Sequence, residues 1–292
     1  MKKKRENGRE IMSAARAVQK TPAVAFLGPE RTFTHQAALD LFGRSASFQA
    51  AETIEEVFSV VEKGLCQKGV VPIENSFEGS VNRTLDLFYQ VDLKISAETF
   101  SRIRHHLLSR EEHMGEITRL YSHPMAIAQC RTWLAAHLTG ATVTEVSSTA
   151  LGAKMASEEP GASAIGGRLA GEAYGLKILA ESIEDISENF TRFLVIGKEE
   201  TNPTGRDKTS ILFLLRHIPG ALHRALEALA KRGINLTRIE SRPMKIRNWE
   251  YLFFVDLEGH EKEDRISDAL KEMETDCLLL KRLGSYPAGS TS

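Results

Sequence analysis

Residues 53–76 read TIEEVFSVVEKGLCQKGVVPIENS, and this stretch decides the class of fold. Thr53 and Glu56 form a capping-box pattern, which begins a helix whose apolar side holds Ile54, Val57, Phe58 and Val61. The apolar run 69–73 follows directly and is typical of a buried strand. A helix followed at once by a buried strand is the repeating unit of an α/β domain.

The same alternation of short strands and helices extends over residues 21–200 and predicts an α/β region with parallel sheets and crossover helices. Residues 201–208 are polar and contain both Pro and Gly, as a domain linker would. Residues 209–286 show the order β-α-β-β-α-β, which predicts a ferredoxin-like domain whose sheet leaves one face for a partner. Residues 287–292 form a polar tail, and residues 1–20 contain an amphipathic helix with Ile11, Ala15 and Val18 on one face.

The composition is that of a globular chain and excludes several classes of function. Of 292 residues, 42% are hydrophobic and 26% charged, which is enough to build a core. A net charge of −1 offers nothing to attract nucleic acid or an anionic membrane. The three cysteines lie far apart, so we expect a soluble protein of a reduced, cytoplasmic compartment. His35, His105 and His106 lack the companions of a metal site, and no glycine-rich nucleotide motif occurs, so we expect neither a metal nor a cofactor.

Polar residues Glu74, Asn75 and Ser76 follow the buried strand of the opening stretch directly. Ligands of open α/β sheets bind beyond the carboxyl ends of strands, so these side chains stand where a site is expected. Asn and Ser are also common helix caps, and an ordinary turn explains the pattern equally well.

Two helix starts, Ser122-His123-Pro124 and Ser147-Ser148-Thr149, offer hydroxyl groups beside free backbone N–H groups. This combination suits a carboxylate, although capping alone also explains it. A third stretch, residues 189–195, is a strand that begins with Thr191 and Arg192. An arginine there could pair with a carboxylate and a threonine could donate to a developing charge, or the two could be a half-exposed and a surface residue.

Taken together, these motifs stand in the order found in one enzyme family. The chain closely resembles prephenate dehydratase at residues 28–34, 71–76, 84–87, 122–124, 129–130, 148–150, 174–176 and 189–193. After the linker, Gly220-Ala221-Leu222 and Glu240-Ser241-Arg242-Pro243 resemble the phenylalanine-binding motifs of that family's regulatory ACT domain. The resemblance implies a catalytic region of two α/β lobes similar to a type II periplasmic-binding protein, with the active site between the lobes.

The family reaction is the decarboxylating dehydration of prephenate to phenylpyruvate, in the biosynthesis of phenylalanine. By resemblance, Thr191 acts on the leaving hydroxyl, Asn75, Ser122 and Gln129 orient the substrate, and Ser148, Thr149 and Arg192 bind its anionic groups. Thr32, Ser76 and Phe193 are further candidates for substrate contact. Glu74 is an alternative proton source if burial raises its pKa.

The resemblance also implies regulation by L-phenylalanine in a homodimer or homotetramer. The candidate effector residues are Gly220, Ala221, Leu222, Asn235, Leu236, Thr237, Glu240, Ser241, Arg242 and Pro243. Free N–H groups near Ala221 would take the carboxylate of the amino acid, and carbonyl groups near Asn235 would take its ammonium group.

Two departures and two rival functions remain open at this point. Arg31 stands where the family usually has Gly, and Met125 where it usually has Gln. Residues 9–19 resemble the last helix of an all-helical chorismate mutase, and a lone helix of that kind would have no mutase activity. A cytoplasmic protein that binds or senses a small anion or amino acid is the alternative on the same two-lobed fold, and a different ACT-regulated enzyme is a third possibility.

Overall fold

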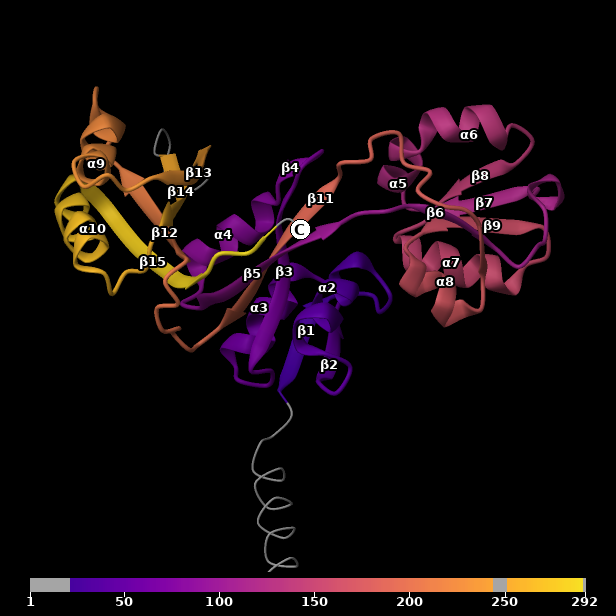
Figure 1. Ribbon diagram of the computed structural model, residues 1–292, viewed down its shortest axis with the longest axis horizontal. Coiled ribbons are helices and arrows are strands. Elements are labelled where there is room, and N and C mark those ends of the chain that lie inside the picture. The colour runs from indigo at the N-terminus through magenta and orange to yellow at the C-terminus, as the bar shows by residue number, and fades with distance from the viewer. Residues whose placement is uncertain (1–21, 244–250, 291–292) are drawn as a thin grey trace, which may run out of the picture.

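The computed structural model describes residues 22–243 and 251–290, which form three sheets, each with its own helices (Figure 1). In the view of Figure 1, lobe 1 lies in the centre, lobe 2 on the right and a third domain on the left. The predicted helix of residues 1–20 lies outside the described residues.

Lobe 1 is a mixed sheet in the order β2-β1-β3-β11-β5, with β4 paired to β3. Its strands are β1 (Ala23–Leu27), β2 (Ser47–Ala51), β3 (Lys68–Asn75), β4 (Gly79–Ser80), β5 (Lys94–Arg102) and β11 (Phe190–Gly197). Its helices are α2 (Phe33–Phe42), α3 (Ile54–Glu62) and α4 (Asn82–Gln90). The Thr53 hydroxyl accepts a hydrogen bond from the Glu56 N–H and so begins α3, which buries Val57, Phe58 and Val61 as its spacing predicts.

Lobe 2 is a second mixed sheet in the order β10-β6-β9-β7-β8. Its strands are β6 (His106–Ser109), β7 (Arg119–Ser122), β8 (Thr142–Glu145), β9 (Ala162–Gly166) and β10 (Lys177–Ala180). Its helices are η1 (Met114–Glu116), α5 (Pro124–Gln129), α6 (Arg131–His137), α7 (Thr149–Glu158) and α8 (Arg168–Tyr174). Gly152 lets α7 lie close to β7, because a Cβ at this position would come within 2.7 Å of the Tyr121 carbonyl oxygen.

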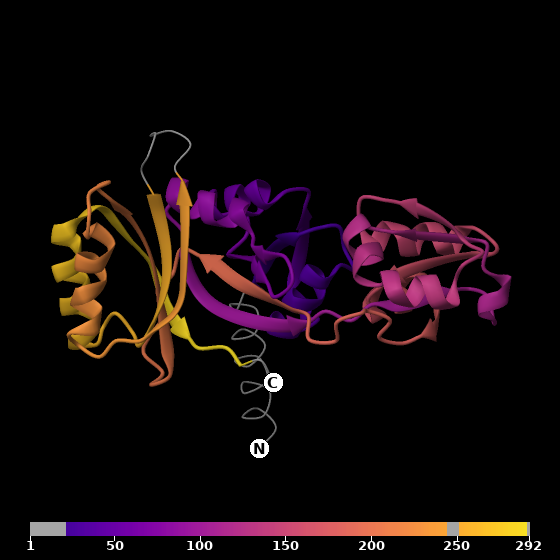
Figure 2. The ribbon, with the colours of Figure 1, turned by 90° about the horizontal axis from the view of Figure 1, so that it is seen from above.

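Two segments join the lobes. Strand β5 leads through residues 103–105 into β6, and the chain returns after β10 to enter β11 of lobe 1 (Figures 1 and 2). Strand β11 runs antiparallel to both β3 and β5, so it places the return segment beside the outgoing one. The prediction of parallel sheets is therefore wrong in part. In lobe 1 the returning strand β11 runs against its neighbours, and in lobe 2 the entering strand β6 runs against β9 and β10.

The third domain has the predicted βαββαβ order with sheet order β13-β14-β12-β15. Its elements are β12 (Asp207–Leu215), α9 (Ala221–Ala230), β13 (Leu236–Pro243), β14 (Tyr251–Glu258), α10 (Asp264–Asp276) and β15 (Cys277–Pro287). The helices cover one face of the sheet (Figure 2). The other face packs on lobe 1, where the Phe254 and Phe88 ring centroids are 6.4 Å apart and Leu212 and Leu214 join the core of lobe 1. That face is therefore covered by the chain itself rather than by a partner.

Candidate functional site

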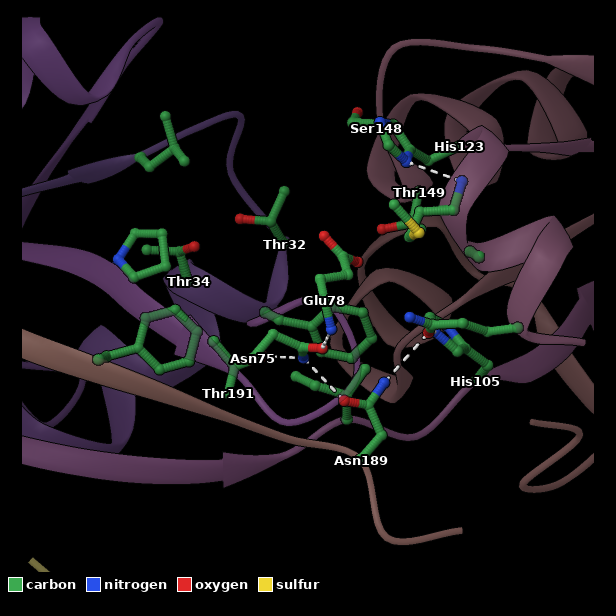
Figure 3. Close-up of a pocket in the computed structure, with 18 of the residues that line it drawn as sticks. Thr32, Thr34, Asn75, Glu78, His105, His123, Ser148, Thr149, Asn189 and Thr191 are labelled. Carbon is green, nitrogen blue, oxygen red and sulfur yellow. Dashed lines mark hydrogen bonds between the residues drawn. The ribbon is translucent and has the colours of Figure 1, made fainter. Parts of the chain in front are cut away.

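A cleft of about 280 Å³ lies between the two lobes, at the ends of β3 and β11. Lobe 1 contributes Thr32, Asn75 and Thr191, and lobe 2 contributes His123 and the start of α7 (Figure 3). Figure 3 shows the labelled side chains of the two lobes facing each other across this space, with Glu78 between them. Parallel strands β1 and β3 both end at this edge, so the polar loop after β3 meets the cleft as the strand-end rule predicts.

Asn75 and Thr191 are register partners on β3 and β11, and their side chains are hydrogen bonded. The Asn75 Oδ1 accepts the N–H groups of Phe77 and Glu78, at 2.9 and 3.0 Å. This fixes the amide orientation, so Asn75 Nδ2 donates to Thr191 Oγ1 at 2.9 Å. Because Thr191 Oγ1 is the acceptor in this bond, its own O–H is left to donate to a group in the cleft.

The hydrogen-bond network continues across the floor of the cleft into lobe 2. Asn75 Nδ2 also donates to Asn189 Oδ1 at 2.7 Å, and Asn189 Nδ2 donates to Gln129 Oε1 at 3.1 Å. His105 Nε2 lies 2.9 Å from the same Gln129 oxygen, which makes Nε2 the protonated nitrogen of the ring. Burial lowers the pKa of His105 despite the hydrogen bond to Gln129, so the ring is neutral near pH 7.

Helix starts supply polar groups from both lobes. The Thr32 hydroxyl caps α2 by accepting the His35 N–H at 3.4 Å, and the Ser148 hydroxyl caps α7 by accepting the Leu151 N–H at 3.0 Å. Thr149, the first residue of α7, also lines the cleft. The first N–H groups of a helix have no partner within the helix, so this end of α7 suits a carboxylate.

Arg192 does not reach the cleft, and its predicted contact with the substrate is wrong. Successive side chains of a strand point to opposite faces, so Arg192 faces away from the space that Thr191 faces. Its guanidinium is buried against Glu98 and Asp256, with the closest Glu98 oxygen at 2.6 Å from Nη2. Tyr286 Oη accepts a third hydrogen bond at 3.1 Å. Arg192 thus joins lobe 1 to the third domain.

Three other predicted residues lie outside the lining of the cleft. Glu74 points to the third domain, where Arg238 Nε lies 3.5 Å from its Oε2. Ser122 is fully buried and donates to the Ile165 carbonyl at 2.8 Å, so it supports β7 and β9. Ser76 donates to the Glu188 carbonyl at 3.2 Å and accepts the Phe190 N–H at 2.9 Å, which fastens the loop after β3 to the segment before β11. Of the predicted substrate-site residues, those that line the cleft are Thr32, Asn75, Gln129, Ser148, Thr149, Thr191 and Phe193.

The sequence analysis missed six polar residues of the cleft as site candidates: Thr34, Glu78, His105, His123, Ser147 and Asn189. Glu78 lies in the same polar loop as Asn75, and Asn189 begins the motif of residues 189–195. Both could therefore have been predicted from the motifs. His105 was interpreted as structural, because nothing in the sequence places it opposite Gln129. Of the two departures, Met125 lines the cleft and Arg31 adopts a φ of 69°.

The candidate effector residues divide over two faces of β13. Glu240 accepts a hydrogen bond from Ser80 at 2.7 Å, and Arg242 pairs with Asp86 at 2.9 Å, so both point into the contact with lobe 1. Thr237, Ser241 and Pro243 are exposed on the opposite face. A small cavity of about 140 Å³ at the start of α9 is lined by Ala221 and Leu222, and Gly220 before it has a φ of 78°. Asn235 lies in the loop before β13, where its carbonyl accepts the Glu258 N–H at 3.0 Å, and Leu236 begins the strand.

Within the described residues, no group of three or more His, Cys, Asp or Glu side chains could hold a metal ion, and no helix is long and apolar enough to span a membrane.

Comparison with known proteins now identifies the family. The family model of prephenate dehydratase matches residues 24–201, and that of the ACT domain matches residues 209–275. The chain belongs to the prephenate dehydratase family. The bifunctional chorismate mutase/prephenate dehydratase of Aquifex aeolicus is 51% identical over 279 residues, which are 96% of this chain and 77% of that protein. The resemblance found in the motifs is therefore confirmed, as is the two-lobed α/β fold followed by an ACT domain.

Two solved structures extend the comparison. A crystal structure of the prephenate dehydratase of Arthrobacter aurescens in complex with L-Phe is 35% identical, with a TM-score of 0.84 over 91% of this chain and 90% of that one. GqqA, described as a novel type of quorum quenching acylase, is 29% identical, with a TM-score of 0.82 over 91% of this chain and 98% of that one.

Proposed function

We propose that this chain converts prephenate to phenylpyruvate, carbon dioxide and water in the cleft between its lobes, with Thr191 as the hydrogen-bond donor to the leaving hydroxyl. Family membership supports the reaction. The observation that supports the role of Thr191 is its hydrogen bond from Asn75, which leaves the threonine O–H directed to the cleft. Prephenate dehydratase chemistry is thus the function that the site supports best.

The reaction needs positioned donors more than it needs a strong acid. When the carboxylate on the ring leaves as carbon dioxide, its bonding electrons enter the ring, and the ring becomes aromatic as hydroxide departs. The hydroxide takes up one proton from solvent and becomes water. A threonine hydroxyl does not titrate near neutral pH, so Thr191 would stabilise the departing oxygen by a hydrogen bond rather than surrender its proton.

Asn75 strengthens this donor. Its amide donates to Thr191 Oγ1, and chained hydrogen bonds polarise one another, so the threonine O–H becomes a better donor. If a carboxyl group acts as the proton source, Glu78 takes the place proposed for Glu74, because Glu78 lines the cleft and Glu74 does not. The start of α7, with Ser148 and Thr149, would hold a substrate carboxylate.

We propose L-phenylalanine as the effector of the ACT domain, because the similar prephenate dehydratase of A. aurescens was crystallised in complex with L-Phe. Its site would include the cavity at the start of α9, where apolar side chains such as Leu222 and Phe253 lie beside Arg216 and His217. Exposed Ile218, Ile239 and Tyr251 on the same domain would support a homodimer or a dimer of dimers with the effector between subunits. The described cysteines, all unpaired, fit a cytoplasmic enzyme.

The direct test of the reaction is to incubate the purified chain with prephenate and follow phenylpyruvate by its absorbance in alkali. Phenylpyruvate formation at a rate well above that of the buffer is the expected result. Tight binding of prephenate without turnover would instead support the alternative, a small-anion binding or sensing protein.

Acylase activity is a second candidate because of the likeness to GqqA. An acylase needs a nucleophile activated by a neighbouring base, and Thr191 Oγ1 is bonded by the amide donor of Asn75 instead. We therefore expect no release of carboxylic acid from a long-chain N-acyl amide under conditions in which prephenate is consumed. Comparable rates on both substrates would give the cleft a second activity.

A further inference from the structure

The substrate of the proposed function is a dianion, but the cleft carries no matching positive charge. Among the described residues that line it, none is Lys or Arg, and Glu78 contributes a carboxyl group. Arg192, the cation that the motif suggested, is committed to Glu98 and Asp256 on the other face of β11. Positive charge for a dicarboxylate must therefore come from another part of the space between the lobes.

A second cavity, of about 340 Å³, adjoins the cleft and is lined by Arg31, Arg102, Arg104 and Arg168. We call it the arginine pocket. It draws residues from both lobes and shares Thr32, Phe33 and Thr149 with the cleft. Arg102 ends β5 and Arg104 lies in the segment that joins the lobes. Arg168 begins α8, and Arg31 lies in the loop before α2.

Alternate residues from the end of β5 to the start of β6 line the two cavities. Ile103 and His105 line the cleft, whereas Arg102, Arg104 and His106 line the arginine pocket. This alternation is that of an extended chain, in which successive side chains point to opposite sides. The two cavities therefore lie on opposite sides of the segment that joins the lobes.

The ring of Phe33 stands between the two cavities. It packs edge-on against His105, with ring centroids 5.5 Å apart. On the lobe 2 side, a Cβ at Gly167 would come within 3.1 Å of its Cε1 atom. One aromatic side chain and the two shared threonines thus separate the arginine pocket from the reacting groups.

The charge of the arginine pocket is only partly neutralised. Arg31 pairs with Glu30 at 3.0 Å, and Arg168 pairs with Glu181 at 2.8 Å. Arg102 donates to the Ser187 carbonyl, and Arg104 has no hydrogen-bond or ion-pair partner within residues 22–243 and 251–290.

Two other ionisable groups of the arginine pocket bear on this balance. Asp40 adds a negative charge to the lining, and its Oδ1 accepts a hydrogen bond from Gln36 at 2.7 Å. Burial and then the charge of Arg168 lower the pKa of His106, so its ring adds no charge at neutral pH. Glu181, which pairs with Arg168, also lies within electrostatic range of Arg104. The lining itself therefore holds four arginines against one carboxylate, and neither Arg102 nor Arg104 makes a direct ion pair within the described residues.

We propose that the arginine pocket is a carboxylate-binding site that captures the dicarboxylate substrate and hands it past Phe33 to Thr191. This inference rests on the proposed function. In other proteins, a cavity lined by one sign of charge raises the local concentration and the on-rate of an oppositely charged ligand by about 10- to 1,000-fold. The arginine pocket has an excess of positive charge, four arginines against Asp40, so we expect an effect at the lower end of this range. The arginine pocket affects the association of the substrate and therefore kcat/KM. The chemical step, and with it kcat, depends on the groups of the cleft.

The test is the replacement Arg104→Gln, which removes a charge without breaking a hydrogen bond of the described structure. At an ionic strength of about 0.01 M we expect kcat/KM for prephenate to fall about 10-fold and kcat to stay within about twofold. At about 1 M the difference from wild type should vanish, because salt screens the charge. Arg104→Lys should restore most of the low-salt value.

Arg110→Gln is the matched control, because it removes the same charge just beyond the far end of β6, where the guanidinium contacts the Ser157 carbonyl. It should behave as wild type. Unchanged kcat/KM and salt dependence in Arg104→Gln and in the Arg102→Gln/Arg104→Gln double variant would overturn the proposal. Equal losses in Arg110→Gln, or a loss in kcat alone, would overturn it as well. Failure of the wild-type chain to consume prephenate would instead reject the proposed function.

Discussion

The two faces of the strand pair β3 and β11 differ sharply, although they are one residue apart. On the cleft face, Asn75 and Thr191 form a neutral hydrogen bond at the edge of an open space. On the opposite face, their neighbours Glu74 and Arg192 make ion pairs with the ACT domain. Strand alternation thus lets one short segment carry both the chemistry and the attachment of the regulatory domain.

The difference between the faces predicts that substitutions at adjacent positions have different consequences. The Arg192 side chain is 5% exposed and its two carboxylate partners are fully buried, so this face depends on matched charge. The cleft face depends on the direction of hydrogen bonds. Substitutions on the face toward the ACT domain should lower the free energy of unfolding. Substitutions on the cleft face should lower kcat.

The largest expected effect is that of Arg192→Gln. It leaves the buried Asp256 without a cation, while Glu98 keeps its pair with Lys208, and breaking a buried ion pair costs about 3–5 kcal/mol. Urea unfolding at fixed protein concentration would measure the change. The control is Arg83→Gln, whose pair with Glu55 lies on the surface and should cost less than about 1 kcal/mol. Similar costs for both variants would mean that the buried face has no special role.

The next effect concerns the cleft face. Thr191→Val keeps the shape of the side chain and removes its donor, so we expect kcat to fall about 100-fold, or about 2.7 kcal/mol. The free energy of unfolding should change little, in contrast to Arg192→Gln. A folded Thr191→Val protein with wild-type turnover would remove Thr191 from the mechanism.

A third, smaller effect is the pH dependence of stability that His105 contributes from the cleft, and the variant His105→Gln separates it from that of other buried histidines. Burial holds the pKa of His105 below its ordinary value of 6.5, so below pH 6.5 the unfolded chain binds a proton that the folded chain excludes. Stability contributed by this group is complete above pH 6.5 and is lost as pH falls, by at most about 1.4 kcal/mol per pH unit. Unfolding curves of wild type and His105→Gln between pH 7 and 5 should diverge accordingly. Parallel curves would contradict a neutral, buried His105.

The smallest effect is expected for Glu74→Gln. The Glu74 side chain is 41% exposed and its ion pair with Arg238 spans 3.5 Å, so the loss of stability should stay below about 1 kcal/mol. Because Glu74 does not line the cleft, kcat should remain within about twofold of wild type. A loss near 100-fold would restore Glu74 as the proton source and place both faces in catalysis.

Much of the fold could be predicted from local pattern. The capping residue Thr53, the apolar spacing of α3 and the βαββαβ order after the linker all agree with the structure. The direction of β11 could not be predicted, because strand direction depends on where the chain returns from lobe 2. The packing of lobe 1 on one face of the ACT sheet could not be predicted either, because residues in contact there, such as Phe88 and Phe254, lie far apart in sequence.

The candidate site was predicted in part, and the errors at Glu74 and Arg192 have one physical cause. Thr191 and Arg192 share a motif, and so do Glu74 and Asn75, but a strand sends neighbouring side chains to opposite faces. Reading the motif as a unit placed all four residues in one site. Residues such as His105 could not be found, because only the fold brings it beside Gln129.

The most direct test of the central claim is a double-mutant cycle on kcat with Asn75→Ala and Thr191→Val. Asn75 Nδ2 donates to Thr191 Oγ1 at 2.9 Å, and groups that act as a unit lose their function together. The account predicts that the double variant turns over prephenate within about threefold of the slower single variant. If the two losses multiply instead, the residues act independently, and the claim that Asn75 prepares Thr191 as the donor to the leaving hydroxyl is wrong.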